Sequence, residues 1–401
     1  MCGMFYIWAF LSPGMKITFL LSRFPYPLDK GDKLRAYHQI KHLSKTHSIS
    51  LFCLSEHEVE QEHIAHLQQY CTEIRIYPIR KPDIFTGLIS AFFSGLPFQV
   101  GYFFRKNLKK NIWADLDSFK PDAIFCQLVR MSEYVKDYNH PNKLLDYMDV
   151  FSSDMRRRKD VSSGLTKWVF ATESKRIAQY EEAIFPAFQK HSIISTQDRD
   201  LLPITNKQQI VVMPNGTDVD ITFPNPIEKE YDILFFGNLS YTPNVESAVF
   251  LAQQIVPELL KKHPNLKVLI AGATPHKRVL ALANNTIEVK GWIEDKWACF
   301  ASAKVFAAPM LINVGMQNKI LEAMAVKTPC VATSLANNAI GAKHNSQIIV
   351  AETAAEFVAA IEELITNDAL ATEIAANAYT FVSSNYSWNA TTKQLEEYLL
   401  T

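Results

Sequence analysis

The chain has 401 residues, 48% of them hydrophobic, and its 41 basic side chains balance 41 acidic ones. This length suits two α/β domains, and the zero net charge gives no field that would attract nucleic acid, so we expect no nucleic-acid partner. The six cysteines show no metal-ligand or redox spacing, which is typical of reduced thiols in a cytoplasmic protein.

The first segment, residues 1–14, is apolar but short, and Pro13 and Gly14 interrupt it. It falls below the roughly 20 residues that a membrane helix needs, and it lacks the basic start of a signal peptide. We therefore expect a flexible extension over 1–14 and a first strand from Lys16 onwards.

A loop and an amphipathic helix follow the first apolar strand, at 16–22. Open α/β sheets bind ligands beyond the carboxyl ends of their strands, and this loop lies at such an end. Gly31, Asp32 and Arg35 are therefore candidate ligand-binding residues. An ordinary loop with solvated charges explains the same residues.

An unusually apolar segment, residues 84–104, precedes a basic run that holds Arg105, Lys106, Lys109 and Lys110. An apolar helix face beside basic residues can dock on an anionic bilayer. It can equally pack inside the domain or receive a lipid-linked acceptor. The sequence leaves these three uses open.

Polar residues follow two further strands, at 122–126 and 143–146. Arg130 comes after the first strand, Asp146 ends the second, and Asp149 follows it, so these side chains should face the same crevice. Arg130 can neutralise a phosphate, and Asp149 or Asp146 can orient or deprotonate a hydroxyl. One of the two aspartates can equally cap a helix.

A second alternation of strands and helices begins after a turn at 214–218 and a proline-containing linker at 224–230. Two of its strands run into glycine: one into Gly237, which Asn238 follows, and one into Gly272. Strands that alternate with helices predict a parallel, doubly wound, Rossmann-like α/β sheet in each half of the chain.

One strand–helix–strand step, residues 305–333, carries the strongest candidate site. An apolar strand ends at Pro309, Gly315 stands at the start of a helix, and Lys319 and Glu322 lie in its first turns. The unpaired N–H groups and positive dipole of a helix start can hold a phosphate, and Lys319 adds a charge there. Glu322 can accept hydrogen bonds from ribose hydroxyls. A buried α/β layer with a solvated Lys319–Glu322 pair explains these residues equally well.

The segment GMQNKILEAMAVKTPCVAT, residues 315–333, resembles the donor-binding segment of retaining GT-B glycosyltransferases of the family 4 type. Glu322 matches the second glutamate of that family's Glu-x7-Glu motif, and Val314 stands at the position of the first. Residues 214–218, PNGTD, resemble the hinge that ends the family's first domain. The resemblance covers nearly the whole chain from Met15, and the GxQNKxLEAMA form is associated with polysaccharide and exosortase-linked gene products.

This resemblance implies a GT-B fold of two Rossmann-like domains that face a central cleft. The acceptor-binding domain would cover 15–225 and the nucleotide-sugar-binding domain 226–385. The helix at 386–401 would cross back to the first domain.

The resemblance also implies roles for single residues. Donor binding falls to Gly237, Asn238, Gly272, Trp292, Ile293, Gly315, Met316, Gln317, Asn318, Lys319 and Glu322. Gly31, Asp32 and Arg35 would face the donor diphosphate and the acceptor. With the crevice at the strand ends, this makes Asp149, Lys319 and Arg130 the candidate catalytic residues. We expect no metal site and no cofactor, because helix dipoles and basic side chains serve instead in GT-B enzymes.

The expected activity is transfer of a hexosyl group from a nucleotide-sugar donor to a glycan or lipid-linked acceptor, with retention of configuration. Such an enzyme would serve polysaccharide biosynthesis for the cell envelope, in the cytoplasm or in peripheral contact with the inner membrane. Asn238 replaces a family arginine and Val314 a family glutamate, which leaves a non-catalytic sugar-nucleotide-binding or scaffold protein as one alternative. The other is a GT-B sugar-nucleotide epimerase, whose characteristic acids and histidine are not evident in the sequence.

Overall fold

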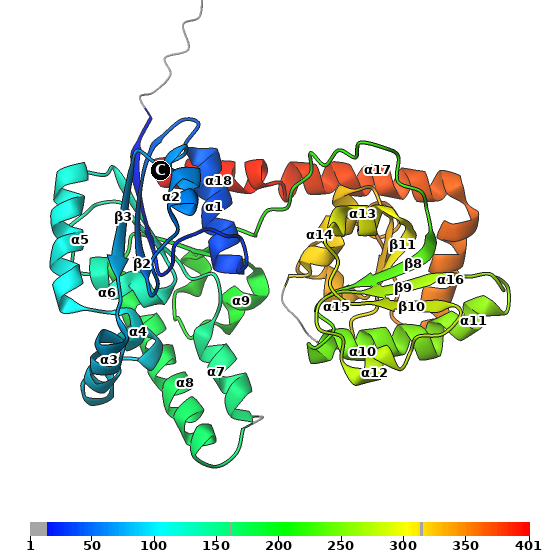
Figure 1. The fold of residues 1–401 in the computed structure, drawn as a ribbon, viewed down its shortest axis with the longest axis horizontal. Helices are drawn as coiled ribbons and strands as arrows, with labels where there is room; N and C mark the ends of the chain where they lie inside the picture. Colours follow the sequence, from blue (N-terminus) through cyan, green and yellow to red (C-terminus); the bar gives the residue numbers. More distant parts are fainter. Residues whose placement is uncertain (1–13, 161, 313–315) are drawn as a thin grey trace, which may run out of the picture. The chain divides into compact units, whose positions relative to one another are not determined.

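Seven parallel strands form the sheet of the first unit, in the order β3-β2-β1-β4-β5-β6-β7 (Figure 1). The computed structural model describes residues 14–160, 162–312 and 316–401, so the extension expected at 1–14 lies almost wholly outside the described residues. The strands are β1 (Lys16–Leu21), β2 (Ser48–Ser55), β3 (Glu73–Pro78), β4 (Ala123–Gln127), β5 (Lys143–Asp146), β6 (Lys190–Ile193) and β7 (Val211–Val212).

Helices cover both faces of this first sheet (Figure 1). They are α1 (Gly31–Leu43), α2 (Gln61–Gln68), α3 (Lys81–Ser94), α4 (Phe98–Phe103), α5 (Lys106–Phe119), α6 (Ser132–Val135), α7 (Phe151–Asp160), α8 (Gly164–Ile184), α9 (Thr196–Leu201) and α18 (Trp388–Leu400). Neighbouring side chains of β1 point to opposite faces, so Phe19 and Leu21 join the core under α1, α2 and α18, whereas Leu20 joins the core under α5, α6 and α8.

Six parallel strands form the sheet of the second unit, in the order β10-β9-β8-β11-β12-β13. They are β8 (Tyr231–Phe236), β9 (Val268–Ala271), β10 (Ile287–Lys290), β11 (Ala303–Ala308), β12 (Cys330–Ala332) and β13 (Ile349–Val350). The helices around it are α10 (Thr242–Phe250), α11 (Val256–Leu260), α12 (Lys277–Leu280), α13 (Lys296–Ala301), α14 (Asn318–Ala325), α15 (Ser334–Asn337), α16 (Ala354–Thr366) and α17 (Asp368–Asn385).

The chain divides into two units at Met213 and Pro214, and residues 392–401 return to the first unit. The boundary that the sequence suggested, at 225, therefore falls inside the second unit. Leu395 and Leu399 of α18 are buried in the core of the first unit, which fixes the end of the chain there. No helix within the described ranges combines the length and the hydropathy needed to cross a bilayer.

The strand order reverses once in each sheet, between β1 and β4 in the first unit and between β8 and β11 in the second. The doubly wound α/β fold predicted from the sequence is thus confirmed in both units. Ligands of such sheets bind beyond the carboxyl ends of the strands that flank the reversal. The loops after β1, β4, β8 and β11 are therefore where a functional site is expected.

Candidate functional site

Helix α14 starts beyond the carboxyl end of β11, at the reversal point of the second sheet. Ile320, Leu321 and Met324 recur at helical spacing and are buried in the core. This apolar face fixes the helix on the sheet and holds its first turn at the ligand-binding edge. The strand and the helix predicted for this segment are present, and the helix begins at Asn318, three residues after Gly315.

The predicted donor-binding residues before and at this first turn have different environments. Met316 is half-buried against the core, Gln317 is buried and Asn318 is exposed. Gly315 lies outside the described residues, so its contact with a phosphate stays a prediction. The backbone N–H groups of the first turn are the donors that a helix leaves unpaired.

Lys319 is buried, with 9% of its surface exposed. Its Nζ donates a hydrogen bond to Asn244 Oδ1 at 2.5 Å and lies 5.1 Å from the centre of the Phe235 ring. An ammonium group has three N–H donors, and within the described ranges Asn244 is its only hydrogen-bond acceptor. Burial lowers the pKa of Lys319 to about 7, while Glu322 acts in the opposite direction. The site thus contains a buried cationic group that lacks a full set of acceptors.

Asn244 connects Lys319 to the glycine loop after β8. Its Nδ2 donates to the carbonyl oxygen of Asn238 at 2.9 Å, and a Cβ added at Gly237 would lie 2.8 Å from the same Nδ2. The network therefore joins the two loops at the reversal point and brings together Gly237, Asn238 and Lys319. The sequence analysis missed Asn244, whose only signal was its place in α10 directly after that loop.

Gly272 allows close contact between two glycine turns, and it supplies a test of the site's geometry. Its φ is +139°, and an added Cβ would lie 1.7 Å from the carbonyl oxygen of Gly237. We expect Gly272→Ala to displace the loop after β8 and to destabilise the protein by roughly 3 kcal/mol or more, because backbone strain and overpacking add. Chemical denaturation measures this loss. Gly291→Ala is the matched control, since an added Cβ there approaches Pro275 no closer than 3.9 Å, and equal stability of the two variants would contradict the account.

Glu322 forms an ion pair with Lys296, at the start of α13, with 2.6 Å between Nζ and Oε1. Lys296 is partly exposed, and 17% of the Glu322 side chain is exposed. The carboxylate is therefore accessible at the same helix face as Lys319, and its second oxygen can accept a hydrogen bond. The sequence suggested Lys319 as the partner of Glu322, but Glu322 pairs with Lys296, because Lys319 turns inward to Asn244.

Trp292 and Ile293, two of the predicted donor-binding residues, lie on the loop between β10 and α13. Trp292 is 81% exposed, and Ile293 is half-buried against the core of the second unit. An exposed indole on a loop beside the carboxyl ends of parallel strands is free to stack on a planar ring. The assignment of both residues to donor binding stays a prediction.

Arg130 and Asp149, two of the predicted catalytic residues, line one hollow of about 350 Å³ in the first unit. Arg157 and Arg158 of α7 line it as well, although the sequence analysis did not name them as site residues. The Arg130 guanidinium donates to Gln99 Oε1 at 2.8 Å and stacks 4.5 Å from the Phe151 ring. Arg130 and Asp149 thus lie at one hollow, as the sequence predicted; their catalytic roles stay a prediction.

Burial lowers the pKa of Arg130 to about 10, and the charge of Arg23 acts in the same direction. The guanidinium still carries its charge at neutral pH. Asp149 is exposed as a residue, but desolvation within the hollow and then the carboxylates of Asp198 and Asp154 raise its pKa. A carboxylate whose pKa is raised is a better proton acceptor.

Arg35 does not face a ligand site, which corrects its assignment to the diphosphate loop. The residue is 1% exposed, and its Nε donates to Asp146 Oδ2 at 2.7 Å. Asp146 is fully buried and also accepts a hydrogen bond from Ser192 Oγ at 2.9 Å. Neither side chain is accessible, so Asp146 is not the residue that would deprotonate a hydroxyl. Their contact holds α1 to the ends of β5 and β6.

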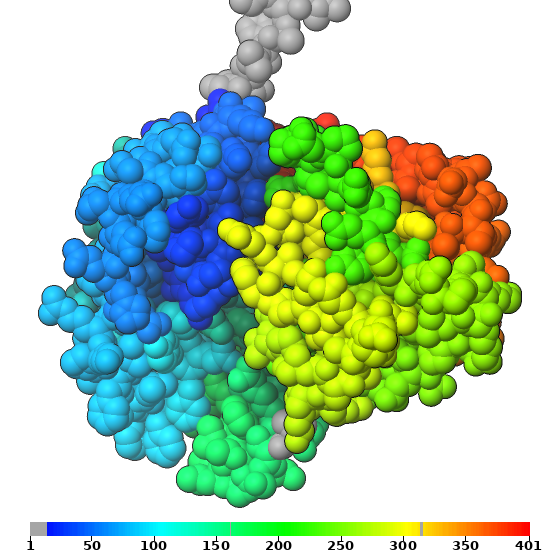
Figure 2. Space-filling view, turned by 45° about the vertical axis from the view of Figure 1, so that its right-hand side comes forward, coloured from blue at the N-terminus to red at the C-terminus, as the bar shows by residue number. Residues whose placement is uncertain are grey.

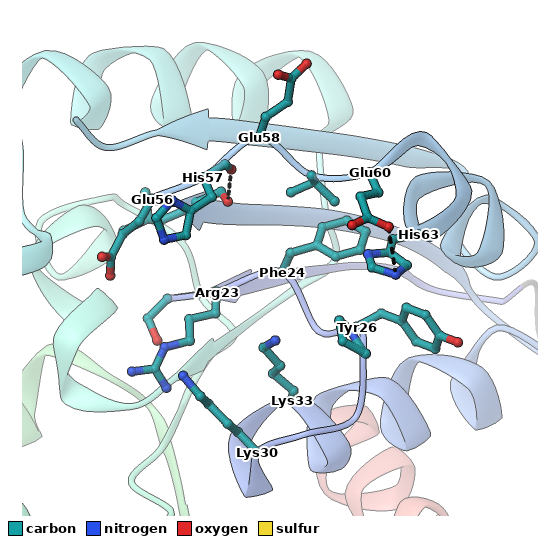
Figure 3. Close-up of a pocket in the computed structure, with 15 residues that line it drawn as sticks. Arg23, Phe24, Tyr26, Lys30, Lys33, Glu56, His57, Glu58, Glu60 and His63 are labelled. Atoms are coloured by element: carbon teal, nitrogen blue, oxygen red, sulfur yellow. Dashed lines mark hydrogen bonds and ion pairs between the residues drawn. The ribbon is translucent and has the colours of Figure 1, made fainter. Parts of the chain in front are cut away.

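A second hollow of the first unit, about 340 Å³, lies beyond the carboxyl ends of β1 and β2 (Figure 3). Arg23, Lys30 and Lys33 approach it from the side of the first loop and α1 (Figure 3). Asp32 forms an ion pair with Arg23 at 2.8 Å, and Gly31 is the first residue of α1. Asp32 therefore orients a basic wall, which the sequence analysis did not predict.

The comparisons with known proteins agree with this arrangement. Residues 230–367 match the family model of glycosyl transferases group 1. A Klebsiella pneumoniae protein named "Uncharacterized 44.6 kDa protein in cps region" is 24% identical over an alignment of 393 positions, which covers 92% of this chain and 96% of that protein. The glycosyltransferase 1 domain-containing protein 1 of Xenopus tropicalis is 35% identical over 77 residues, 19% of this chain and 22% of that protein.

Solved structures are similar over almost the whole chain. A glycosyltransferase from Rickettsia africae has a TM-score of 0.65 at 14% identity, covering 96% of this chain and 98% of its own. Anabaena Alr3699/HepE, in complex with UDP and glucose, has a TM-score of 0.65 at 16% identity, covering 96% of this chain and 99% of its own. Within the second unit, residues 230–367 thus match the group 1 glycosyl transferases, and the chain as a whole has the α/β fold of GT-B glycosyltransferases.

Proposed function

We propose that this protein transfers a hexosyl group from a nucleotide-sugar donor to a glycan or lipid-linked acceptor, with retention and without a metal ion. The donor binds at the carboxyl edge of the second sheet, where the loops after β8 and β11 meet. The group 1 family match and the UDP complexes of the Anabaena neighbour support this class of donor.

The observation that carries the proposal is the buried Lys319 ammonium with its single acceptor. Burying a cation without full compensation costs free energy, and the lowered pKa expresses that cost. A diphosphate at the start of α14 offers several anionic oxygens, which would satisfy the remaining donors of Lys319 and accept hydrogen bonds from the backbone N–H groups of Asn318 and Lys319. The protein therefore has a binding position suited to an anion at this point.

Lys319 then serves the chemistry as well as binding. When the sugar leaves, negative charge grows on the departing diphosphate, and a fixed cation with a helix N-terminus stabilises it without a metal ion. Asp149 would accept the proton of the acceptor hydroxyl, and Arg130 with its neighbouring arginines would hold an anionic part of the acceptor. The Klebsiella relative, named for a cps region, supports an acceptor from polysaccharide biosynthesis.

The proposal is tested by incubating the protein with UDP-, GDP- and ADP-sugars and following the release of nucleoside diphosphate, with and without EDTA. We expect release from one of these donors, unchanged by EDTA, and a product whose anomeric configuration matches that of the donor by NMR. No release from any donor, or loss of release with EDTA, would refute the corresponding part of the proposal.

We expect Glu322→Ala to raise the KM for the donor by roughly 10- to 100-fold and to change kcat less. Its carboxylate would accept hydrogen bonds from the ribose, and bonds to a charged group contribute about 1.5–3 kcal/mol. Steady-state kinetics with varied donor measures this split. Glu363→Ala, at an exposed glutamate of α16, is the matched control. A KM equal to that of the control would remove Glu322 from the donor site.

The Glu322–Lys296 ion pair favours one alternative, a non-catalytic sugar-nucleotide-binding protein. The pair occupies one oxygen of the carboxylate, so Glu322 can have a purely structural role. Isothermal titration calorimetry and the release assay separate the two functions. A binding protein would take up the nucleotide sugar and release no diphosphate at any enzyme concentration.

A further inference from the structure

Helix α3 exposes an apolar stripe that no described residue covers. Phe85, Ile89, Phe92 and Phe93 are 66%, 43%, 52% and 82% exposed. They fall within roughly 100° of the helix circumference at 100° per residue. The opposite face holds Gly87 and Ala91, which are buried against Gly101 of α4. The packing thus directs the large aromatic side chains outward, away from the core.

Helix α8 packs against the end of α3 and exposes apolar side chains of its own. The Arg176 guanidinium donates to the carbonyl oxygens of Ala91 and Phe92 at 3.2 Å each, so α8 is fixed against the end of α3. Leu165 and Trp168, nearer the start of α8, are 77% and 57% exposed. We call Phe85, Ile89, Phe92, Phe93, Leu165 and Trp168 the apolar patch. In Figure 2 the α7–α8 hairpin forms the teal-green lobe at the lower edge of the molecule.

Basic residues lie beside α3. A hollow of about 810 Å³ runs along the side of α3 and is lined by Lys106, Lys109, Lys110 and Lys136. Lys109 and Lys136 have carboxylate partners at 2.6 Å, whereas within the described ranges Lys106 and Lys110 have no ion-pair partner. Near the end of α7, Arg156 adds an exposed basic side chain, whereas Arg157 and Arg158 pair with Asp154.

We propose that this face of the first unit docks on an anionic bilayer surface. The apolar patch would enter the boundary between headgroups and acyl chains, and Lys106, Lys110 and Arg156 would contact the headgroup phosphates. A large apolar face flanked by lysine and arginine is the chemistry of interfacial membrane binding. The inference does not rest on the glycosyltransferase proposal, because membrane binding needs neither donor nor acceptor.

The flanking charges favour a bilayer over a second copy of the chain. In a two-fold dimer through the apolar patch, the same surface would face itself, which would bring lysines and arginines of both copies together. Like charges placed opposite one another oppose association. An anionic bilayer instead supplies the complementary sign over the whole face.

Co-sedimentation with vesicles of phosphatidylcholine, with and without phosphatidylglycerol, tests the proposal on the full chain. We expect binding to the anionic vesicles that weakens with salt. The triple variant Phe85→Ser, Phe92→Ser, Phe93→Ser should lower the partition coefficient by roughly 30-fold or more. Because these side chains are exposed, circular dichroism and the melting temperature should stay those of the wild type. Leu280→Ser, at a residue of α12 that is 53% exposed, is the control and should bind as the wild type.

A second variant tests the charges independently of the aromatic residues. Lys106→Gln with Lys110→Gln should weaken binding to anionic vesicles by about 10-fold or more, and Lys261→Gln with Lys343→Gln, at exposed lysines of the second unit, should not. The proposal would be overturned if the wild-type protein did not bind anionic vesicles, or if the triple variant bound them as the wild type does. It would also be overturned by a lipid-free dimer, seen by analytical ultracentrifugation, that the triple variant abolishes.

Discussion

Lys319→Met is expected to lower kcat by 100-fold or more. A buried cation at the departing diphosphate contributes on the scale of one transition-state electrostatic donor, about 10²–10³ in rate. Methionine keeps most of the volume and apolar length of the lysine, so the variant removes the charge and the hydrogen bond to Asn244 with little change in packing.

Stability separates this loss of function from unfolding. The pKa of Lys319 in the folded protein, about 7, lies below the ordinary value of 10.5, so the folded state binds fewer protons between these pH values. The contribution of Lys319 to stability therefore rises with pH over this window, and its buried charge opposes folding at lower pH. Lys319→Met should be at least as stable as the wild type at pH 6. Lys343→Met, at an exposed lysine, is the kinetic control, and a Lys319→Met enzyme with the same kcat as this control would refute the role.

Arg35→Met is expected to destabilise the first unit by about 3–5 kcal/mol. The substitution leaves Asp146 as a fully buried carboxylate without its cation, and an uncompensated buried charge carries a cost of this size. The double variant Arg35→Met, Asp146→Leu removes both charges, and we expect it to recover most of the lost stability. Denaturant unfolding followed by circular dichroism measures all three proteins.

Arg23→Met is the matched control for this second prediction. Arg23 also pairs with an aspartate of the first loop, at 2.8 Å, but 31% of its side chain is exposed, so its loss should change stability by about 1 kcal/mol or less. Arg35→Met that unfolds like the wild type but binds donor poorly would restore Arg35 to the ligand site and contradict its structural role.

The sequence predicted the helices and strands better than it predicted the contacts between side chains. Helix α14 and strand β11 follow from a local apolar period, because a helix or strand must bury one face whatever the rest of the chain does. The pairing of Arg35 with Asp146 joins residues 111 positions apart, and nothing in the local pattern of α1 distinguishes a buried arginine from a ligand-binding one. A charged residue one turn inside a helix after a strand is compatible with both roles.

The site at the start of α14 shows the same limit of prediction from sequence. Lys319 and Glu322 are three residues apart, and helical spacing alone suggests that they pair with each other. In the structure they turn to partners from other helices, Asn244 of α10 and Lys296 of α13. Those partners become visible only when the strand order places the loops after β8, β10 and β11 at one edge of the sheet. The family resemblance identified the segment, but the burial of Lys319 needed the three-dimensional arrangement.

The most direct test of the central claim is the pH dependence of nucleotide-sugar binding, measured by calorimetry on the wild type and on Lys319→Met. Lys319 loses its proton near pH 7 in the free protein, and a bound diphosphate favours the charged form, so binding takes up a proton above that pH. Wild-type affinity should therefore fall as the pH rises from 7 towards 9, by up to about tenfold per pH unit, and the affinity of Lys319→Met should be lower and nearly constant. Equal affinities and parallel pH profiles for the two proteins would contradict a diphosphate site at the start of α14.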